Sequence, residues 1–323
     1  MKVLITGMDG FIGKAISQRL KSSGWDVVGF SNGPDAGRIP FLYKGSITDL
    51  SALRTVFNEE RPSACVHLAG LAHATVRSDE IDLVRQVNVS GTLNTAKAAA
   101  ETGVTQFVFF SSSKVYGDST PLAGLDEDEE PKPVGIYAEA KYQAEQELAE
   151  MARKGELGVV VIRPVAVFGR GDSRGNYARL IRAVRKGVFP VIDGGRARRS
   201  IAYLDRVGER IDRILGPAFV SGRTYVFSDG EFELKEILES MRRATGRAFF
   251  PSVPAWFAKA SGGMVDWLWQ KTTGKEGHAK EALARLTENF VVRAHHYDSD
   301  FGKLDPFDLD LAMAETCAFE NLD

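Results

Sequence analysis

The chain has 323 residues, enough to bury a large core as one large domain or as two closely joined ones. Its 41 basic and 43 acidic side chains nearly balance, which argues against a nucleic-acid-binding surface, and two cysteines suggest neither a disulfide framework nor a zinc site. No run approaches the ~20 apolar residues of a membrane-spanning helix, and no signal-peptide pattern opens the chain, so we expect a cytoplasmic protein without a membrane span or a metal.

Short apolar runs alternate with helical patterns through the first half of the sequence. The predicted strands are residues 3–6, 26–30, 41–44, 64–68, 106–111 and 159–163, and the predicted helices are residues 14–22, 51–58, 82–101 and 136–154. This alternation predicts an α/β fold with a parallel sheet covered on both faces, whose strands end at one common edge where ligands bind. Beyond Pro164 the pattern is less regular, and we expect that half to select the substrate.

A glycine-rich segment directly follows the first predicted strand. Gly7, Gly10 and Gly13 have the spacing G-x-x-G-x-x-G and lead into the helical pattern at residues 14–22. In a strand–turn–helix unit, the first glycine allows a tight turn, the second lets the backbone approach a pyrophosphate, and the third lets helix and strand pack closely. Free N–H groups and the positive end of the helix dipole favour phosphates there. The segment predicts a dinucleotide-binding turn, and a glycine-rich turn without a ligand is the alternative.

Tyr137 and Lys141 are four residues apart, so on a helix both side chains lie on one face. A phenol, with a reference pKa of about 10, is a poor base at neutral pH. A cation one helical turn away favours the phenolate and lowers that pKa. The pair could therefore move a proton to or from a sugar or steroid hydroxyl while a hydride moves elsewhere. The pattern Y-x-x-x-K is common by chance, and its value comes from the glycine-rich segment that precedes it.

Six motifs in order make the chain resemble the extended short-chain dehydrogenases that act on nucleotide-diphosphate sugars. They lie at residues 6–13, 67–70, 88–92, 111–117, 137–141 and 163–169. The resemblance covers the chain from residue 1 to about residue 323. The more similar members are UDP-glucose 4-epimerases and reductases of UDP-linked 4-keto sugars in bacterial surface-polysaccharide synthesis.

The resemblance implies a Rossmann-type, doubly wound parallel sheet with a smaller C-terminal substrate-binding domain. The Rossmann domain would take residues 1–165, joined by about 200–230, and the substrate-binding domain would take most of residues 166–323. Family members often dimerise through a four-helix bundle, so a homodimer through residues 82–101 and 136–154 is also implied.

The resemblance also assigns roles to individual residues. Ser112, four residues before the tyrosine of V-Y-G, would hydrogen-bond the substrate oxygen and help to polarise a C4 carbonyl. Tyr137 would donate or accept the proton at that oxygen, and Lys141 would hold the nicotinamide ribose and lower the tyrosine pKa. The expected cofactor-binding residues are Gly7, Asp9, Gly10, Phe11, Ile12, Gly13, Ser31, Asn32, Arg38, Ser46, Ile47, Leu68, Ala69, Gly70, Asn88, Tyr137, Lys141 and Pro164. The expected substrate-binding residues are Ser112, Ser113, Asn176 and Arg199, with the arginine on the diphosphate.

Two departures from the family's pattern narrow the function. Sugar dehydratases carry an acidic pair just after the catalytic serine, where this chain has Ser113 and Lys114, so dehydration is disfavoured. An NAD-preferring enzyme usually ends its second strand with Asp or Glu for the ribose 2′-hydroxyl, whereas this strand ends with Ser31 and Asn32. A 2′-phosphate would meet no repulsion there, and Ser31, Asn32 or Arg38 could donate to it, so NADP is slightly preferred and NAD stays open.

These observations predict an NAD(P)-dependent oxidoreductase acting at C4 of a nucleotide-diphosphate sugar. A UDP-4-keto-sugar reductase is favoured, and a UDP-sugar 4-epimerase is the alternative, because both use Ser112, Tyr137 and Lys141. They differ in cofactor behaviour, since an epimerase recycles a tightly held NAD and a reductase releases the oxidised cofactor each turnover. A non-catalytic regulator that senses NADP is disfavoured because the Tyr–Lys pair is intact.

Two other segments are interpreted without a catalytic role. The acidic run at residues 126–130 predicts a solvated loop. The apolar, aromatic segment at residues 256–269 predicts core packing, with a subunit or membrane-surface contact as the alternative.

Overall fold

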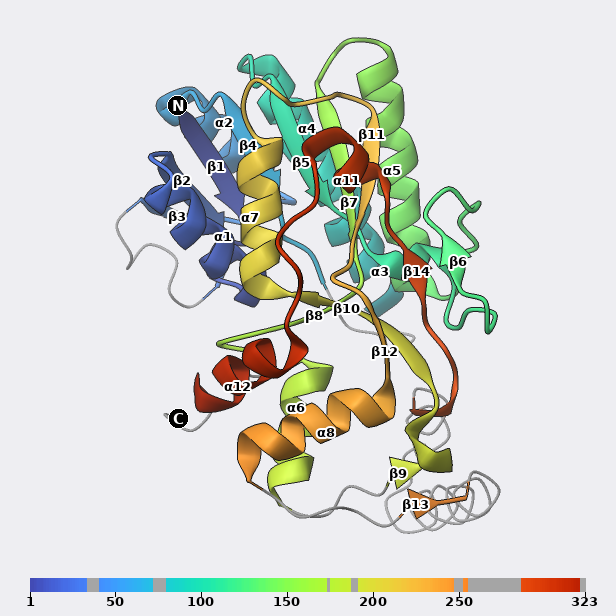
Figure 1. Cartoon of the computed structure of the whole chain (residues 1–323). Coiled ribbons are helices and arrows are strands. Elements are labelled where there is room, and N and C mark those ends of the chain that lie inside the picture. Colours follow the sequence, from blue (N-terminus) through green and yellow to red (C-terminus); the bar gives the residue numbers. More distant parts are fainter. Residues whose placement is uncertain are drawn as a thin grey trace.

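A computed structural model of the chain describes residues 1–33, 41–71, 80–172, 175–186, 191–246, 252–254 and 286–319. At its centre lies a seven-stranded sheet in the order β11-β7-β5-β4-β1-β2-β3, in which all neighbouring strands are parallel (Figure 1). Its strands are β1 (Lys2–Thr6), β2 (Asp26–Ser31), β3 (Leu42–Lys44), β4 (Ala64–His67), β5 (Gln106–Phe110), β7 (Val159–Pro164) and β11 (Arg223–Phe227). The sheet confirms the predicted α/β fold.

Helices cover both faces of the sheet (Figure 1). Helices α1 (Phe11–Ser22) and α7 (Leu204–Ile214) pack together on one face, and α2 (Leu50–Glu60), α4 (Thr92–Glu101) and α5 (Ile136–Arg153) pack on the other. Successive strand residues point to opposite faces, so Val3 and Ile5 join the first core while Leu4 joins the second. Burial on both faces explains why the strands read as continuous apolar runs.

The helix predicted over residues 82–101 consists of three pieces. Helix α3 (Ile81–Arg85) leads into a π-helical turn (Gln86–Gly91), which continues into α4. Within the turn, the fully buried Asn88 exchanges two hydrogen bonds with the backbone of Leu71, at 2.8 and 3.0 Å. Such turns are frequent at functional positions, and this one directs Asn88 to the loop after β4. The homodimer expected through these helices and α5 stays a prediction.

The second half of the chain adds a smaller sheet and its own core. Strand β10 (Arg198–Tyr203) pairs in parallel with β8 (Ala166–Phe168) and antiparallel with β12 (Glu231–Glu233). Helices α6 (Asn176–Arg185), α8 (Leu234–Thr245) and α12 (Leu309–Phe319) surround that core in the lower part of Figure 1. The short strands β9 (Val191–Ile192) and β13 (Ser252–Val253) also pair.

The chain returns to the main sheet through α7 and β11, while the division into two domains stays a prediction. The aromatic segment at 256–269 lies outside the described residues. None of the described helices combines the length and apolar character needed to cross a membrane.

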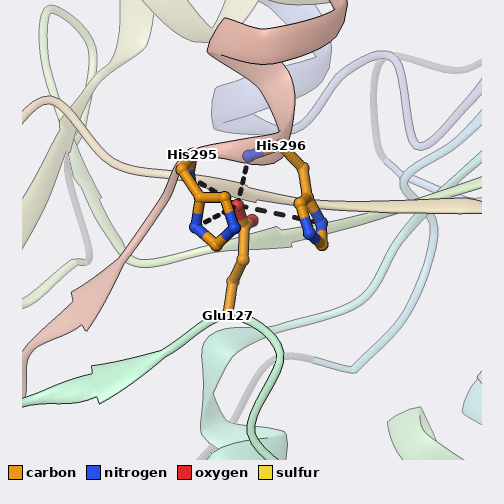
Figure 2. Close-up of side chains that lie close together, drawn as sticks. All are labelled: Glu127, His295 and His296. Atoms are coloured by element: carbon orange, nitrogen blue, oxygen red, sulfur yellow. Dashed lines mark hydrogen bonds and ion pairs between the residues drawn. The ribbon is translucent and has the colours of Figure 1, made fainter.

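A buried carboxylate fastens the C-terminal segment to the main sheet. Strand β14 (Val292–Arg293) pairs with β6 (Leu125–Asp126) and is followed by α11 (His296–Phe301). Glu127 is only 6% exposed, so the predicted solvated loop is wrong at this residue. Its Oε1 accepts from the backbone N–H groups of His295 and His296 (Figure 2). Its Oε2 accepts from Val226 N at 3.0 Å. Because backbone N–H groups occupy both oxygens, we assign Glu127 a structural role.

We predict that Glu127→Gln lowers the free energy of unfolding by about 2–3 kcal/mol, because one amide end places a donor against a backbone N–H group. Urea denaturation at neutral pH measures the change. Glu129→Gln removes an exposed charge from the same loop and is the matched control, expected to stay within about 0.5 kcal/mol of the wild type. Equal stability of the two variants would contradict the structural role of Glu127.

Candidate active site

The glycine-rich loop between β1 and α1 is shaped by close backbone contacts. Gly7 has a φ of +69°, and a Cβ on it would lie 2.9 Å from Ala69 N. A Cβ on Gly13 would lie 2.3 Å from Gly7 O, so α1 can approach β1 only through glycine. Among the described residues, a Cβ on Gly10 would meet only Gly7 O, at 3.2 Å. The packing of the protein therefore does not require glycine at this exposed position, whereas the close approach of a ligand would.

The N-terminus of α1 opens beside this loop without a side-chain cap and without an acidic residue in its first turn. Its N–H groups are therefore available to an anion, and the helix dipole favours negative charge there. The cradle suits the pyrophosphate of a dinucleotide.

Ser112 and Tyr137 meet at the carboxyl edge of the sheet. Ser112 follows β5, where its Oγ caps a short 3₁₀ turn and accepts from Lys114 N at 3.2 Å. Tyr137 lies in the first turn of α5, where its phenol interacts with the Ser112 side chain. The structure thus brings a hydroxyl and a phenol, distant in the sequence, to one point.

Lys141 lies one turn further along α5 and is almost wholly buried. Its Nζ donates to the carbonyl of Phe110, the last residue of β5, at 2.8 Å. A Cβ on Gly70 would lie 3.4 Å from Lys141 Nζ and 2.9 Å from Asn88 Oδ1. The amine, the amide and the loop after β4 therefore converge beside Ser112 and Tyr137.

Burial dominates the electrostatics of these groups. Burial raises the pKa of Tyr137, and the hydrogen bond from Ser112 lowers it. The expectation that Lys141 also lowers the tyrosine pKa stays a prediction. Burial also lowers the pKa of Lys141 to about 8, against the opposing charge of Glu145.

His67 holds together the elements that carry this site. It is completely buried at the end of β4, and burial together with the Lys141 charge lowers its pKa to about 3. The ring hydrogen-bonds Thr6 Oγ1 at 2.7 Å and Thr92 Oγ1 at 3.0 Å. A neutral His67 thus ties β4 to β1 and α4, which hold the glycine-rich loop and the π-helical turn.

The other expected cofactor-binding residues follow strand ends or helix starts. Ala69 N donates to Thr6 Oγ1 at 3.2 Å, and Ser46 Oγ shares a hydrogen bond of 2.8 Å with Thr48. Ile47 is buried against Gly91 of the π-helical turn. Phe11 and Ile12 open α1, Leu68 follows β4, Asn32 follows β2 and Pro164 ends β7, whereas Arg38 lies outside the described residues.

The end of β2 differs from what the sequence predicts. The strand itself supplies no carboxylate, but Ser31 Oγ donates to Asp9 Oδ1 from the glycine-rich loop, and Gly33 N donates to Ser31 Oγ at 3.1 Å. The prediction that a 2′-phosphate would meet no negative charge at this strand end is therefore wrong. The sequence did not reveal this contact because Asp9 and Ser31 are separated by 22 positions.

The expected substrate-binding residues lie partly in the second half of the chain. Asn176 is the exposed first residue of α6. Arg199, in β10, is partly buried, and burial lowers its pKa while the neighbouring Tyr177 and Glu288 raise it. The structure thus places Arg199 near the residue that follows Asn176. Ser113 is almost wholly buried, which disfavours a substrate contact through its side chain.

The profile of the NAD dependent epimerase/dehydratase family matches residues 3–226. The chain belongs to this family. It is 26% identical to a UDP-glucose 4-epimerase of Vibrio cholerae over 97% of this chain and 94% of that protein. It is 28% identical to a 2-alkyl-3-oxoalkanoate reductase of Stenotrophomonas maltophilia over 76% of each chain. The family match confirms the resemblance drawn from the six motifs and makes the protein an enzyme.

The fold is also that of a solved relative. The crystal structure of a Thermotoga maritima UDP-glucose 4-epimerase with UDP-glucose superposes with a TM-score of 0.80 over 100% of both chains, at 21% identity. At this identity the likeness establishes the fold.

We predict that affinity for NADH falls as the pH rises above about 8, because the Lys141 ammonium expected to hold the nicotinamide ribose is then lost. The folded-state pKa of Lys141 lies below its ordinary 10.5, so the folded protein loses this ammonium near pH 8, where an unfolded chain would keep it. Between about pH 7.5 and 9.5 the dissociation constant, measured by fluorescence titration, should rise about tenfold or more. Lys141→Arg keeps its charge throughout, so its profile should be flat even if its affinity is lower. The same slope in both proteins would contradict a role for the Lys141 ammonium in binding the dinucleotide.

Proposed function

We propose that the protein is a 4-epimerase of a UDP-linked sugar and uses NAD. The observation that carries the proposal is that Ser112 and Tyr137 interact beside the buried Lys141, next to the glycine-rich loop. A proton-transferring phenol is thereby held at the sheet edge where a dinucleotide would lie. Similarity to a 4-epimerase along nearly the whole chain supports this reading.

Each side chain would have a distinct task at the sugar O4. As a phenolate, Tyr137 would take the proton from O4 when C4 is oxidised and return it when C4 is reduced again. Ser112, whose side chain interacts with the phenol, would hold the same oxygen and orient Tyr137 towards it. Lys141, when protonated, would add positive charge that favours the phenolate and would donate to ribose hydroxyls. A bound nicotinamide would supply the hydride acceptor and donor at C4.

The second half of the chain would hold the nucleotide diphosphate. Arg199 offers a planar guanidinium suited to phosphate oxygens, and its partial burial strengthens such a contact. Asn176 opens α6 near this position and could donate to the diphosphate or the sugar.

A UDP-4-keto-sugar reductase is the second candidate. The same three side chains would serve it, and a 2-alkyl-3-oxoalkanoate reductase is among the relatives. The sequence favoured the reductase over the epimerase because the second strand has no carboxylate at its end, which suited NADPH. Asp9 removes that advantage, because its carboxylate is hydrogen-bonded to Ser31 there.

Cofactor retention and turnover test the proposal together. The purified protein is denatured and any released dinucleotide is identified by mass spectrometry, while a second sample converts UDP-sugars without added cofactor. Released NAD in near-stoichiometric amount, with interconversion of a C4 epimer pair seen by NMR, is the expected result. An empty protein that oxidises NADPH with a 4-keto sugar would establish the reductase, and failure to bind either dinucleotide would overturn both candidates.

We predict that Tyr137→Phe lowers turnover at least about 100-fold, because the variant lacks the hydroxyl that moves the proton. Dinucleotide binding and the melting temperature should change little. Tyr142→Phe removes a phenol from the same helix and is the matched control, expected to keep near-normal turnover. Near-normal turnover in Tyr137→Phe would exclude this mechanism.

A further inference from the structure

Asp9 lies in the glycine-rich loop, at a position that the spacing of the three glycines leaves free. Its carboxylate is held in a defined place at the end of β2. Oδ1 accepts from Ser31 Oγ, and Ser31, the last residue of the strand, is only 7% exposed. Oδ2 lies against the residue two positions beyond the strand, since a Cβ on Gly33 would be 1.7 Å away. The orientation of Asp9 is fixed on both sides. One carboxylate oxygen lies against Gly33, where only glycine leaves room for it, and the other accepts the hydrogen bond from Ser31.

This position matters because of where a dinucleotide lies in such a sheet. The pyrophosphate sits at the glycine-rich loop, and the adenine ribose extends to the carboxyl end of the second strand, where an acidic side chain accepts from the ribose 2′-hydroxyl. Here Ser31 and Asn32 occupy that strand end, and neither carries a charge. The only residue of the loop with a charge, Asp9, reaches the same place from the other side.

We propose that Asp9 determines the cofactor preference and makes the protein select NAD over NADP. The carboxylate supplies from the glycine-rich loop the negative charge that the strand lacks. It would accept a hydrogen bond from a ribose hydroxyl and would repel the roughly doubly negative 2′-phosphate of NADP. Within the described ranges no cationic side chain forms an ion pair with Asp9 that would cancel this charge.

A purely structural role for Asp9 gives a different expectation. The hydrogen bond to Ser31 also joins the loop to β2, and an uncharged acceptor would serve that purpose as well. Asp9→Asn keeps the shape and an acceptor oxygen while removing the charge, so it separates the two roles. Asp26→Asn removes a charge from the opposite end of β2 and is the matched control.

The test is direct titration of NADH and NADPH by fluorescence, using the full chain freed of any retained dinucleotide, with the melting temperature as a second readout. Wild-type protein and Asp26→Asn should bind NADH at least about 100-fold more tightly than NADPH. In Asp9→Asn that ratio should fall at least about tenfold, mainly because NADPH binds more tightly, while the melting temperature changes little. If Asp9→Asn folds poorly, Asp9→Ser, which also retains a polar acceptor, should give the same change in ratio.

The inference rests on the proposed dinucleotide-dependent function, and titration separates the two failures because it needs no sugar turnover. A wild-type protein that binds NADPH as tightly as NADH, or an Asp9→Asn variant with an unchanged ratio, would overturn the role of Asp9 alone. Failure of the wild type to bind either dinucleotide would overturn this inference together with the proposed function.

Discussion

The close approach of α1 to β1 is the constraint on which the rest of the site depends. A side chain on Gly13 would lie 2.3 Å from Gly7 O, so only glycine lets the helix come down on the loop. This contact turns the uncapped start of α1 towards the carboxyl edge of the sheet. It also carries Asp9 across to the end of β2, where the carboxylate meets Ser31. One steric requirement thereby shapes both the phosphate cradle and the charge beside the ribose position.

Around this loop several buried polar side chains have hydrogen-bond partners. Asn88 binds the backbone of Leu71, His67 lies between two threonine hydroxyls, and Lys141 donates to the end of β5. A buried polar group costs free energy unless it is hydrogen-bonded, so these contacts keep a desolvated site stable. The result is a set of groups fixed in place before any ligand binds, which favours catalysis by a positioned proton carrier.

The second half of the chain is attached to this framework by contacts between residues that are far apart in the sequence. Glu127 joins β11 to the segment that begins α11, and β10, which carries Arg199, pairs with β8 and β12. The family model matches residues 3–226, which hold the glycine-rich loop and the Tyr–Lys pair. Selection of the sugar and nucleotide would then fall to the less regular second half.

The sequence by itself determined the parallel α/β fold, the glycine-rich turn and the pairing of Tyr137 with Lys141. These features depend on local periodicity, on glycine at close backbone contacts and on spacing within one helix, all of which are visible along the chain. The tertiary structure alone decided that Asp9 meets Ser31, that Glu127 is buried and that a π-helical turn aims Asn88 at the loop after β4. Such contacts join segments far apart in the sequence, and the packing of side chains, not their order, brings them together.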